Sequence, residues 1–303
     1  MPLHLVNVPT VPTSGNEDLA RFSRTLRRHA PQLGRTLPWI GSDDPWAVLV
    51  SEVMLQQTQV ARVLAPWRRF LDAFPNATAC ADAPLSSTLR LWDGLGYHRR
   101  AKALREAATV IRDQHGGEVP RDVAALRALP GVGEYTAHAV ASFAFGRRVA
   151  VLDTNVGRVL ARAVANRTLT RHEARDLADR LLPVRGVAAH NQAMLDLGAQ
   201  FCRANPRCDS CPMARVCRWH HEDGEDPAPF SAAVSRRQST FEGSDRQVRG
   251  QVLGLLRRGE ATMTGVAAHV EPVGRDRVER IVSGLVDDGL VQRVGRRFRL
   301  AVG

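Results

Sequence analysis

Hydrophobic residues recur along most of this chain at intervals of three and four positions, which is the spacing of one face of an α-helix. The pattern predicts a series of amphipathic helices separated by short loops rich in Gly, Pro and Asp. Their expected ranges are 16–32, 45–57, 59–73, 85–94, 97–115, 121–129, 134–145, 154–165, 171–182 and 188–200. No segment before residue 290 shows the alternation of a β-strand. The sequence therefore predicts a mainly α fold.

The composition changes between His220 and Gly243, where polar residues, Pro, Gly and Ser predict a linker. Beyond it, the pattern predicts helices at 245–258, 262–270 and 275–288, and then a basic hairpin at 291–300 with a turn near Gly295. Three helices and a hairpin are typical of a winged-helix-like module, a variant of the helix-turn-helix. Its eleven arginines against seven acidic residues favour DNA as a partner, while packing on the main domain or binding a protein stays open.

Four segments are expected from these patterns. Residues 1–15 are predicted to be a flexible N-terminus, 16–219 a helical domain, 220–243 the linker and 244–303 the small module. The first segment lacks the basic and apolar pattern of a secretory signal, and no run approaches eighteen apolar residues. We therefore expect a cytoplasmic protein without a membrane span.

The charge of the chain favours a polyanionic partner. The formal net charge is +11 and the isoelectric point is about 10.8. Only one of the 42 basic residues, Lys102, is a lysine. Arginine binds phosphate in a bidentate manner, but its guanidinium does not act as an amine nucleophile in proteins.

A short glycine turn joins two of the predicted helices. Leu129-Pro130-Gly131-Val132-Gly133 ends one helix and begins the next. Glycine permits a tight turn, and without side chains the backbone N–H groups can approach a phosphate. Leu129, Gly131, Val132 and Gly133 are therefore expected to form a helix-hairpin-helix contact with DNA that reads no base sequence.

A carboxylate follows twenty residues after this turn. Asp153 stands at the N-cap of the helix that starts with Thr154 and Asn155, so we expect the helix dipole and backbone donors to keep it ionised. An anion beside a DNA contact is what cleavage of an N-glycosidic bond needs, because the transition state resembles an oxocarbenium ion. We expect Asp153 to be catalytic, with Asn155 beside it, although a simple cap would explain the same pattern.

The segments LPGVGEYTA (129–137) and VLDTN (151–155) together resemble the helix-hairpin-helix superfamily of DNA glycosylases, which includes endonuclease III and MutY. The similarity extends over about residues 35–217. It implies a two-lobed fold, with a helical barrel at about 58–150 and a second lobe from 16–57 and 151–201. Bifunctional members carry a lysine where this chain has Tyr135, so the resemblance implies a monofunctional enzyme with Tyr135 in the active site.

The segment PWAVLVSEVMLQQT (45–58) resembles the signature of MutY-type adenine glycosylases. It implies that Glu52 is the general acid that protonates a ring nitrogen of adenine, with burial and the DNA charge keeping it protonated. A buried acid and an ionised Asp153 are the carboxylate pair expected for glycosidic cleavage. Gln56 and Gln57 are implied to lie near the DNA, one of them inserted into the base stack.

The segment LGYHRRA (95–101) also resembles this family. Tyr97 is implied to stack beside the partner base, filling the gap that a flipped nucleotide leaves. Arg99 and Arg100 are expected to contact phosphates, unless they only form a solvated helix face.

Four cysteines, Cys202, Cys208, Cys211 and Cys217, lie close together and predict a metal site, with zinc left open by the spacing alone. The family resemblance favours a [4Fe–4S] cluster with a positioning role. The first gap holds five residues where the family pattern has six.

The leading hypothesis is an adenine DNA glycosylase that acts on adenine opposite 8-oxoguanine or guanine and starts base excision repair. The expected partner is damaged or mispaired double-stranded DNA, with a sliding clamp or repair enzymes as further partners, for a monomer associated with the nucleoid. Two alternatives stay open, since Tyr135 resembles the mismatch thymine glycosylases and the tail has the wrong pattern for a Nudix-like domain. One is a thymine or uracil glycosylase acting on mismatches with guanine, and the other is a non-catalytic DNA-binding protein.

Overall fold

The computed structural model describes residues 14–222, 224–231, 234, 240–270 and 272–302. Most of the expected flexible N-terminus and part of the expected linker at 220–243 lie outside the described residues. Contacts divide the chain into two compact units, Met1–Thr36 with Gly146–Arg236, and Leu37–Phe145 with Arg237–Gly303. None of the helices in the described part is both long and apolar enough for a membrane crossing.

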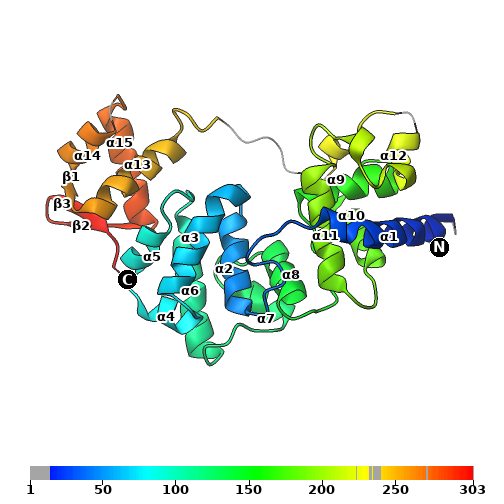
Figure 1. The fold of residues 1–303 in the computed structure, drawn as a ribbon. Helices are drawn as coiled ribbons and strands as arrows, with labels where there is room; N and C mark the ends of the chain where they lie inside the picture. Colours follow the sequence, from blue (N-terminus) through cyan, green and yellow to red (C-terminus); the bar gives the residue numbers. More distant parts are fainter. Residues whose placement is uncertain (1–13, 223, 232–233, 235–239, 271, 303) are drawn as a thin grey trace, which may run out of the picture. The chain divides into compact units, whose positions relative to one another are not determined.

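The first part of the second unit is a bundle of helices, as predicted (Figure 1). These are α2 (Pro45–Leu55), α3 (Val60–Ala73), α4 (Ala77–Asp82), α5 (Leu85–Leu91), α6 (Arg99–Gln114), α7 (Val123–Ala128) and α8 (Glu134–Phe143). Aromatic side chains fill the bundle core, where Phe70 contacts Trp46, Phe74 and Trp92 at ring-centroid distances of 6.5, 5.1 and 6.2 Å. Burial of these large rings stabilises this part of the chain.

Helix α2 is the central helix of this bundle. Asp44 caps it by accepting a hydrogen bond from the Trp46 N–H at 2.9 Å, and Pro45 occupies its first turn. Every residue from Trp46 to Met54 is buried, and the helix packs on α3, α6 and α8. These contacts hold α2 in the second unit, whereas the expected two-lobed division grouped residues 16–57 with the other lobe.

The C-terminal part of the second unit is a small module of three helices and a three-stranded sheet. Its elements are α13 (Asp245–Arg258), β1 (Ala261–Thr262), α14 (Met263–His269), α15 (Arg275–Asp287), β2 (Val291–Val294) and β3 (Arg297–Leu300). Strands β2 and β3 form the predicted hairpin, with Gly295 in its turn at a φ of 59°. The strand order is β1-β3-β2, and all pairs are antiparallel.

The module packs on the bundle through α5. The Leu85 N–H donates to the Val302 carbonyl at 3.0 Å, and both α13 and β3 contact α5. Asp288 at the end of α15 binds the guanidinium groups of Arg99 and Arg249, and Asp93 binds that of Arg257. The module is therefore part of the same compact unit as the bundle, rather than a body held only by a linker.

The first unit is also helical. It contains α1 (Ser14–Leu33), α9 (Thr154–Val159), a π-helical turn (Leu160–Ala165), α10 (Arg171–Leu181), α11 (Val187–Gln200) and α12 (Arg218–His221), with 3-10 turns at Cys208–Ser210, Ala214–Val216 and Ala228–Phe230. Helix α11 packs on α1 and α9. The buried Asn191 of α11 fixes the segment before α9, because its amide accepts from the Val151 N–H and donates to the Val149 carbonyl.

Most predicted helices are present, with differences at short elements. Helix α4, which packs on α6, was not predicted. The prediction of no strand before residue 290 was wrong at β1, two residues whose pairing with β3 no local pattern reveals. The helix expected at 154–165 is α-helical only as far as Val159.

Candidate active site

The glycine turn forms the predicted hairpin between α7 and α8. Asp122 caps α7 by accepting hydrogen bonds from the N–H groups of Ala124 and Ala125, and the Val132 N–H donates to the Leu129 carbonyl at 3.1 Å. Gly133 is the N-cap of α8, and no side chain caps that helix end. The side chains of Leu129 and Val132 are buried, so these two residues can offer only backbone groups to a phosphate.

Gly131 is needed in this hairpin for two physical reasons. Its φ of 73° is in the left-handed region, and an added Cβ would lie 2.7 Å from the Cβ of Ala103 on α6. We expect Gly131→Ala to destabilise the protein by about 2 kcal/mol and to weaken DNA binding, as measured by urea unfolding and fluorescence anisotropy.

The matched control is Gly116→Ala, because Gly116 has a similar φ of 62° but open space around it. That variant should show only the backbone strain and should bind DNA normally. Equal unfolding free energies for the two variants would contradict the role given to the contact with Ala103.

Asp153 is at the N-terminus of α9, where the sequence placed it. Its Oδ1 accepts from the Val156 N–H at 2.8 Å, and its Oδ2 accepts from Nδ2 of Asn155 at 2.6 Å. Arg158 donates in turn to Oδ1 of Asn155 at 2.6 Å. The structure therefore brings Asp153 and Asn155 together and adds Arg158, which sequence reasoning had missed.

The burial of Asp153 was not foreseen from the sequence. Burial raises the pKa of this carboxyl, and the Val156 N–H, the Asn155 amide and the charge of Arg158 only partly oppose that rise. The sequence identified the helix cap but not the burial, and the ionised state of this carboxyl stays a prediction.

Arg158 also connects this carboxylate to the cysteine segment. Its Nε donates to the Cys202 carbonyl at 2.7 Å, and its Nη2 donates to the Gly198 carbonyl at 3.1 Å. A single side chain thus bridges the start of α9, the end of α11 and the first cysteine.

Gly198 is a second residue that sequence reasoning had missed. An added Cβ there would lie 2.6 Å from the Cβ and the carbonyl oxygen of Asn155. We expect Gly198→Ala to displace the Asp153–Asn155 turn, to destabilise the protein by about 2 kcal/mol and to slow base excision. Urea unfolding and single-turnover kinetics test this.

Gly250→Ala is the control for Gly198→Ala, since Gly250 is also inside a helix and has no atom within 4 Å of an added Cβ. Ala is the better helix former, so this control should be neutral or slightly stabilising. A Gly198→Ala variant as stable and as active as the unmodified protein would show that the close contact is unimportant.

Glu52 lies on α2 and is 6 % exposed. The residues before and after it in the helix are buried as well, which agrees with the apolar surroundings expected from the sequence. Tyr135 is in the first turn of α8, directly before Thr136, whose Oγ1 accepts from Nε2 of Gln56 at 3.1 Å. The end of α2 and the start of α8 are therefore adjacent within the second unit.

Two of the predicted DNA-contact residues have unusual backbone conformations. Gln57 and Tyr97 have φ angles of 55° and 47°, and among the described non-glycine residues only Asn166 shares this left-handed region. Such conformations are costly and concentrate at functional sites. This observation supports a special role for Gln57 and Tyr97.

Arg100 connects the turns that carry these two residues. Its guanidinium donates to the carbonyls of Val53, Met54 and Gln56 at the end of α2, and to Leu95 and Gly96 before Tyr97. Burial lowers the pKa of Arg100 to about 10, so it remains a cation at neutral pH.

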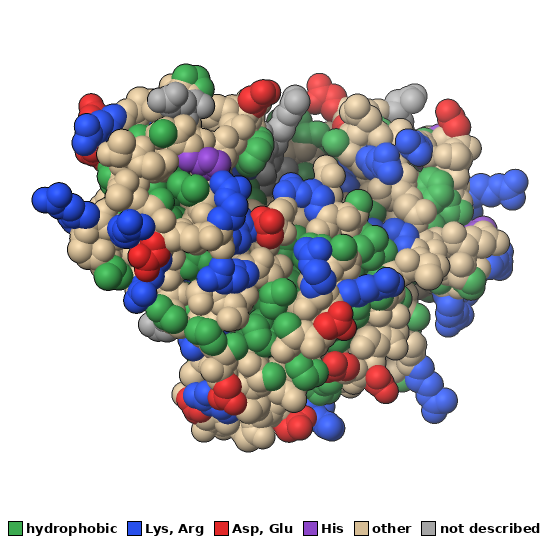
Figure 2. Space-filling view, turned by 60° about the vertical axis from the view of Figure 1, so that its left-hand side comes forward, with side chains coloured by type: hydrophobic (Ala, Val, Ile, Leu, Met, Phe, Trp, Pro, Cys, Tyr) green, Lys and Arg blue, Asp and Glu red, His purple; other side chains and the backbone are tan. Residues whose placement is uncertain are grey.

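The structure narrows the prediction of phosphate contacts at this helix start. The guanidinium of Arg100 donates to internal carbonyls, so it is not directed at a phosphate. The Arg99 side chain pairs with Asp288 at 2.5 Å but is 73 % exposed, so its phosphate contact stays a prediction. On the face shown in Figure 2, Lys and Arg side chains (blue) lie scattered among Asp and Glu side chains (red).

The four predicted metal ligands lie together in the first unit. The side chains of Cys202, Cys208, Cys211 and Cys217 line one mainly apolar cavity of about 30 Å³, which His220 also lines. The guanidinium of Arg162, 1 % exposed, contacts Sγ of Cys202 at 3.5 Å. Within the described residues, no three His, Cys, Asp or Glu side chains are placed to hold a single metal ion. Cys80 is separate from this group and buried, which raises the pKa of its thiol to about 12.

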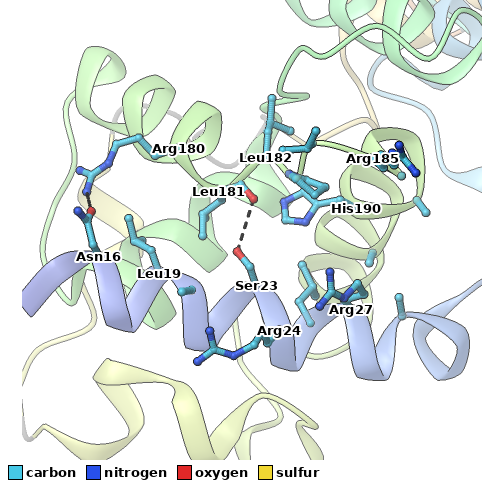
Figure 3. A pocket seen from close by; sticks show the side chains of 18 residues that line it. Asn16, Leu19, Ser23, Arg24, Arg27, Arg180, Leu181, Leu182, Arg185 and His190 are labelled. Carbon is cyan, nitrogen blue, oxygen red and sulfur yellow. Dashed lines mark hydrogen bonds between the residues drawn. The ribbon is translucent and has the colours of Figure 1, made fainter.

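A larger cavity of about 830 Å³ lies in the first unit between α1 and the segment joining α10 to α11 (Figure 3). Ser23 of α1 donates to the Leu181 carbonyl within it, and Arg180 donates to Asn16 at 2.9 Å. Arg24, Arg27 and Arg185 also line it, but none of the predicted site residues does. The cavity is therefore not part of the candidate active site.

A backbone hairpin suited to phosphate, a carboxylate at a helix N-terminus and a carboxylate buried in an apolar helix define a helix-hairpin-helix DNA glycosylase. The comparisons with known proteins agree with this class. The family model of the "HhH-GPD superfamily base excision DNA repair protein" matches residues 50–183.

Curated relatives narrow the class. The adenine DNA glycosylase of Mycobacterium tuberculosis is 45 % identical over 280 residues, covering 88 % of this chain and 89 % of that protein. The adenine DNA glycosylase of Homo sapiens is 38 % identical over 233 residues, covering 72 % and 43 % respectively. The chain belongs to the HhH-GPD superfamily and, within it, to the adenine DNA glycosylase family.

Solved structures support the fold. A thermostable thymine-DNA glycosylase matches with a TM-score of 0.63 and 28 % identity, covering 68 % of this chain and 98 % of that one. A trapped endonuclease III–DNA covalent intermediate matches with a TM-score of 0.61 and 26 % identity, covering 68 % and 97 %.

Proposed function

We propose that this protein is a monofunctional DNA glycosylase that excises adenine paired with 8-oxoguanine or guanine and so starts base excision repair. The observation that carries the proposal is the buried carboxyl of Glu52 on an otherwise apolar helix, because an acid is needed to release a purine as a neutral base. The extended similarity to adenine DNA glycosylases supports the same choice of base.

The proposed reaction is hydrolysis of the bond between C1′ and N9 of a flipped deoxyadenosine nucleotide. Glu52 donates a proton to N7, so adenine leaves as a neutral molecule when the bond breaks. Asp153 stabilises the positive charge that develops on the sugar, and that charge in turn favours the ionised form of the carboxyl. Water adds to C1′ and gives its proton to the carboxylate of Glu52, which restores the acid and leaves an abasic site in an intact strand.

Binding is proposed to use elements of the second unit that surround the damaged base pair. Backbone N–H groups of Gly131 and Gly133 bind a phosphate, while the Val132 N–H closes the turn on the Leu129 carbonyl. Gln57 enters the space that the flipped base has left, and Tyr97 stacks beside the opposing base. The left-handed conformation of both residues supports this assignment.

Duplexes with A·8-oxoG, A·G, T·G and U·G pairs test the proposal when abasic sites are cleaved with alkali after incubation. Adenine release from the first two duplexes is the expected result. Release of thymine or uracil would identify a mismatch pyrimidine glycosylase instead, and binding without release of any base would identify a non-catalytic DNA-binding protein.

Borohydride trapping tests the monofunctional mechanism. Tyr135 has no amine, and the ammonium of Lys102 is occupied with Glu106 at 3.5 Å and lies beside Gly289 of the module. We expect little covalent DNA adduct, because a Schiff base requires an amine at the sugar. Strong trapping under conditions that trap a bifunctional glycosylase would refute this mechanism.

The four cysteines are proposed to hold a [4Fe–4S] cluster that positions the surrounding loop. The four residues line one apolar cavity, and Arg162, whose guanidinium also pairs with Asp226, donates to Sγ of Cys202 at 3.5 Å, which supports this assignment. When bound, the cluster would link the four cysteines and so fix the conformation of the segment that carries them. Absorbance near 400 nm and iron analysis of the purified protein test the assignment, and stoichiometric zinc would contradict it.

The C-terminal module is proposed to be a winged helix. The helices and strands occur in the order α13-β1-α14-α15-β2-β3, and the β2–β3 hairpin forms the wing, which supports this assignment.

A further inference from the structure

Two arginines from different parts of the second unit contact the ring of Tyr97. The guanidinium carbon of Arg100 lies 5.4 Å from the ring centroid, and that of Arg246 lies 5.6 Å from it. Nη1 of Arg246 also donates to the Tyr97 hydroxyl at 2.5 Å. Arg100 follows Tyr97 closely in the sequence, whereas Arg246 belongs to the C-terminal module.

Arg246 is itself held in place by its surroundings. It lies in the first turn of α13, a helix capped by Ser244, whose hydroxyl accepts from the Gln247 N–H at 3.3 Å. Its guanidinium carbon also lies 5.5 Å from the centroid of the Phe241 ring. Contact with two aromatic rings limits the orientations that the Arg246 side chain can adopt.

The module is anchored on both sides of Tyr97 along the chain. Asp93, before Tyr97, pairs with Arg257 of α13, and Arg99, after it, pairs with Asp288 at the end of α15. Arg249, one turn after Arg246, pairs with the same Asp288. The start of α13 is therefore fixed relative to the turn that carries Tyr97.

The orientation of this ring matters for the proposed function. A tyrosine in the left-handed region pays a backbone cost, so its position depends on contacts that hold it there. An aromatic ring beside the opposing base distinguishes bases only if its position is defined, since a mobile ring can adapt to any of them. Arg246 supplies a hydrogen bond and a stacking contact that define it.

We propose that Arg246 is a positioning residue that holds Tyr97 in the orientation for stacking, and that the C-terminal module thereby controls discrimination between the bases opposite adenine. The inference rests on the proposed function. It gives the module a role that does not require it to touch the opposing base.

A double-mutant cycle tests the coupling. Arg246→Ala, Tyr97→Phe and the double variant are compared with the unmodified protein in single-turnover adenine release from A·8-oxoG and A·G duplexes. Arg246→Ala should reduce the ratio of the two rates about tenfold, a typical effect of losing a hydrogen bond to a charged group. In the Tyr97→Phe background, which lacks the hydroxyl, the same substitution should change the ratio about threefold or less.

Two further variants distinguish the positioning role of Arg246 from a general effect of positive charge, and thermal unfolding distinguishes it from a loss of folding. Arg275→Ala removes one positive charge from an exposed position of the same module and should leave the ratio unchanged. Arg246→Lys retains the charge but not the guanidinium, and should give an intermediate ratio. Thermal unfolding identifies any variant whose fold is lost, and Tyr97→Phe then still reports on the hydroxyl.

The possible failures are distinguishable. If the unmodified protein releases no adenine from either duplex, the proposed function is wrong. If it releases adenine and discriminates, but Arg246→Ala keeps the same ratio, the positioning role is wrong. Equal effects of Arg246→Ala in both Tyr97 backgrounds would show that Arg246 acts independently of the hydroxyl.

Discussion

Replacing Asp153 with Asn should slow adenine release about a thousandfold, the effect expected when a charge that stabilises the transition state is lost. Asn is as good an N-cap as Asp, so the hydrogen bond from the Val156 N–H can be retained. The substitution therefore removes the negative charge with little change in shape. Single-turnover kinetics with an A·8-oxoG duplex measure the rate, and fluorescence anisotropy measures the affinity.

The control for this prediction is Asp44→Asn, which makes the same change at the exposed N-cap of α2. It should leave the rate close to that of the unmodified protein. DNA affinity and unfolding temperature should be similar in both variants. An Asp153→Asn variant that retains a tenth or more of the activity would refute the role given to this carboxylate.

Replacing Glu52 with Gln should slow adenine release by a hundredfold or more. Glutamine has nearly the same size and can occupy the same buried position on α2, but its amide cannot give a proton to the leaving base. Because the loss is confined to the chemical step, affinity for the duplex should change little. The rate is measured under single-turnover conditions, as for Asp153.

Glu106→Gln is the matched control, since Glu106 is a half-exposed glutamate on α6 that pairs only with Lys102 among the ion pairs described. Its rate of adenine release should be unchanged.

Duplexes that carry a base able to leave without protonation offer a second comparison. The rate of base release from such a duplex should fall less on Glu52→Gln than the rate of adenine release. Equal slowing of both substrates would argue for a structural role of Glu52.

The sequence predicted the helical architecture because buried faces repeat every three to four residues. Long helices such as α6 and α11 were predicted, whereas the short helix α4, which packs on α6, was not. The two-residue strand β1 exists because β3 pairs with it, and no local signal precedes such pairing. Local pattern therefore sufficed for the long elements and failed for those defined by tertiary contacts.

The same distinction applies to the candidate site. Asp153 was identifiable as a helix cap, which is a local feature, and Glu52 through the resemblance of residues 45–58 to the signature of MutY-type glycosylases. The engagement of Arg100 with the end of α2, and the raised pKa of Asp153, depend on neighbours that approach from distant segments. Gly198 gave no signal, since a glycine inside a helix looks the same whether or not another backbone packs against it.

The sequence has a single lysine, Lys102, which allows site-selective labelling of this protein. The Nζ of Lys102 on α6 is 3.1 Å from where a Cβ of Gly289 would lie, and the side chain is 35 % exposed. Amine-reactive dyes would therefore label one side chain, besides the chain terminus, at the surface where bundle and module meet. A fluorophore on Lys102 should report whether the module stays packed against α6 while DNA is bound and released. The labelling requires no engineered cysteine.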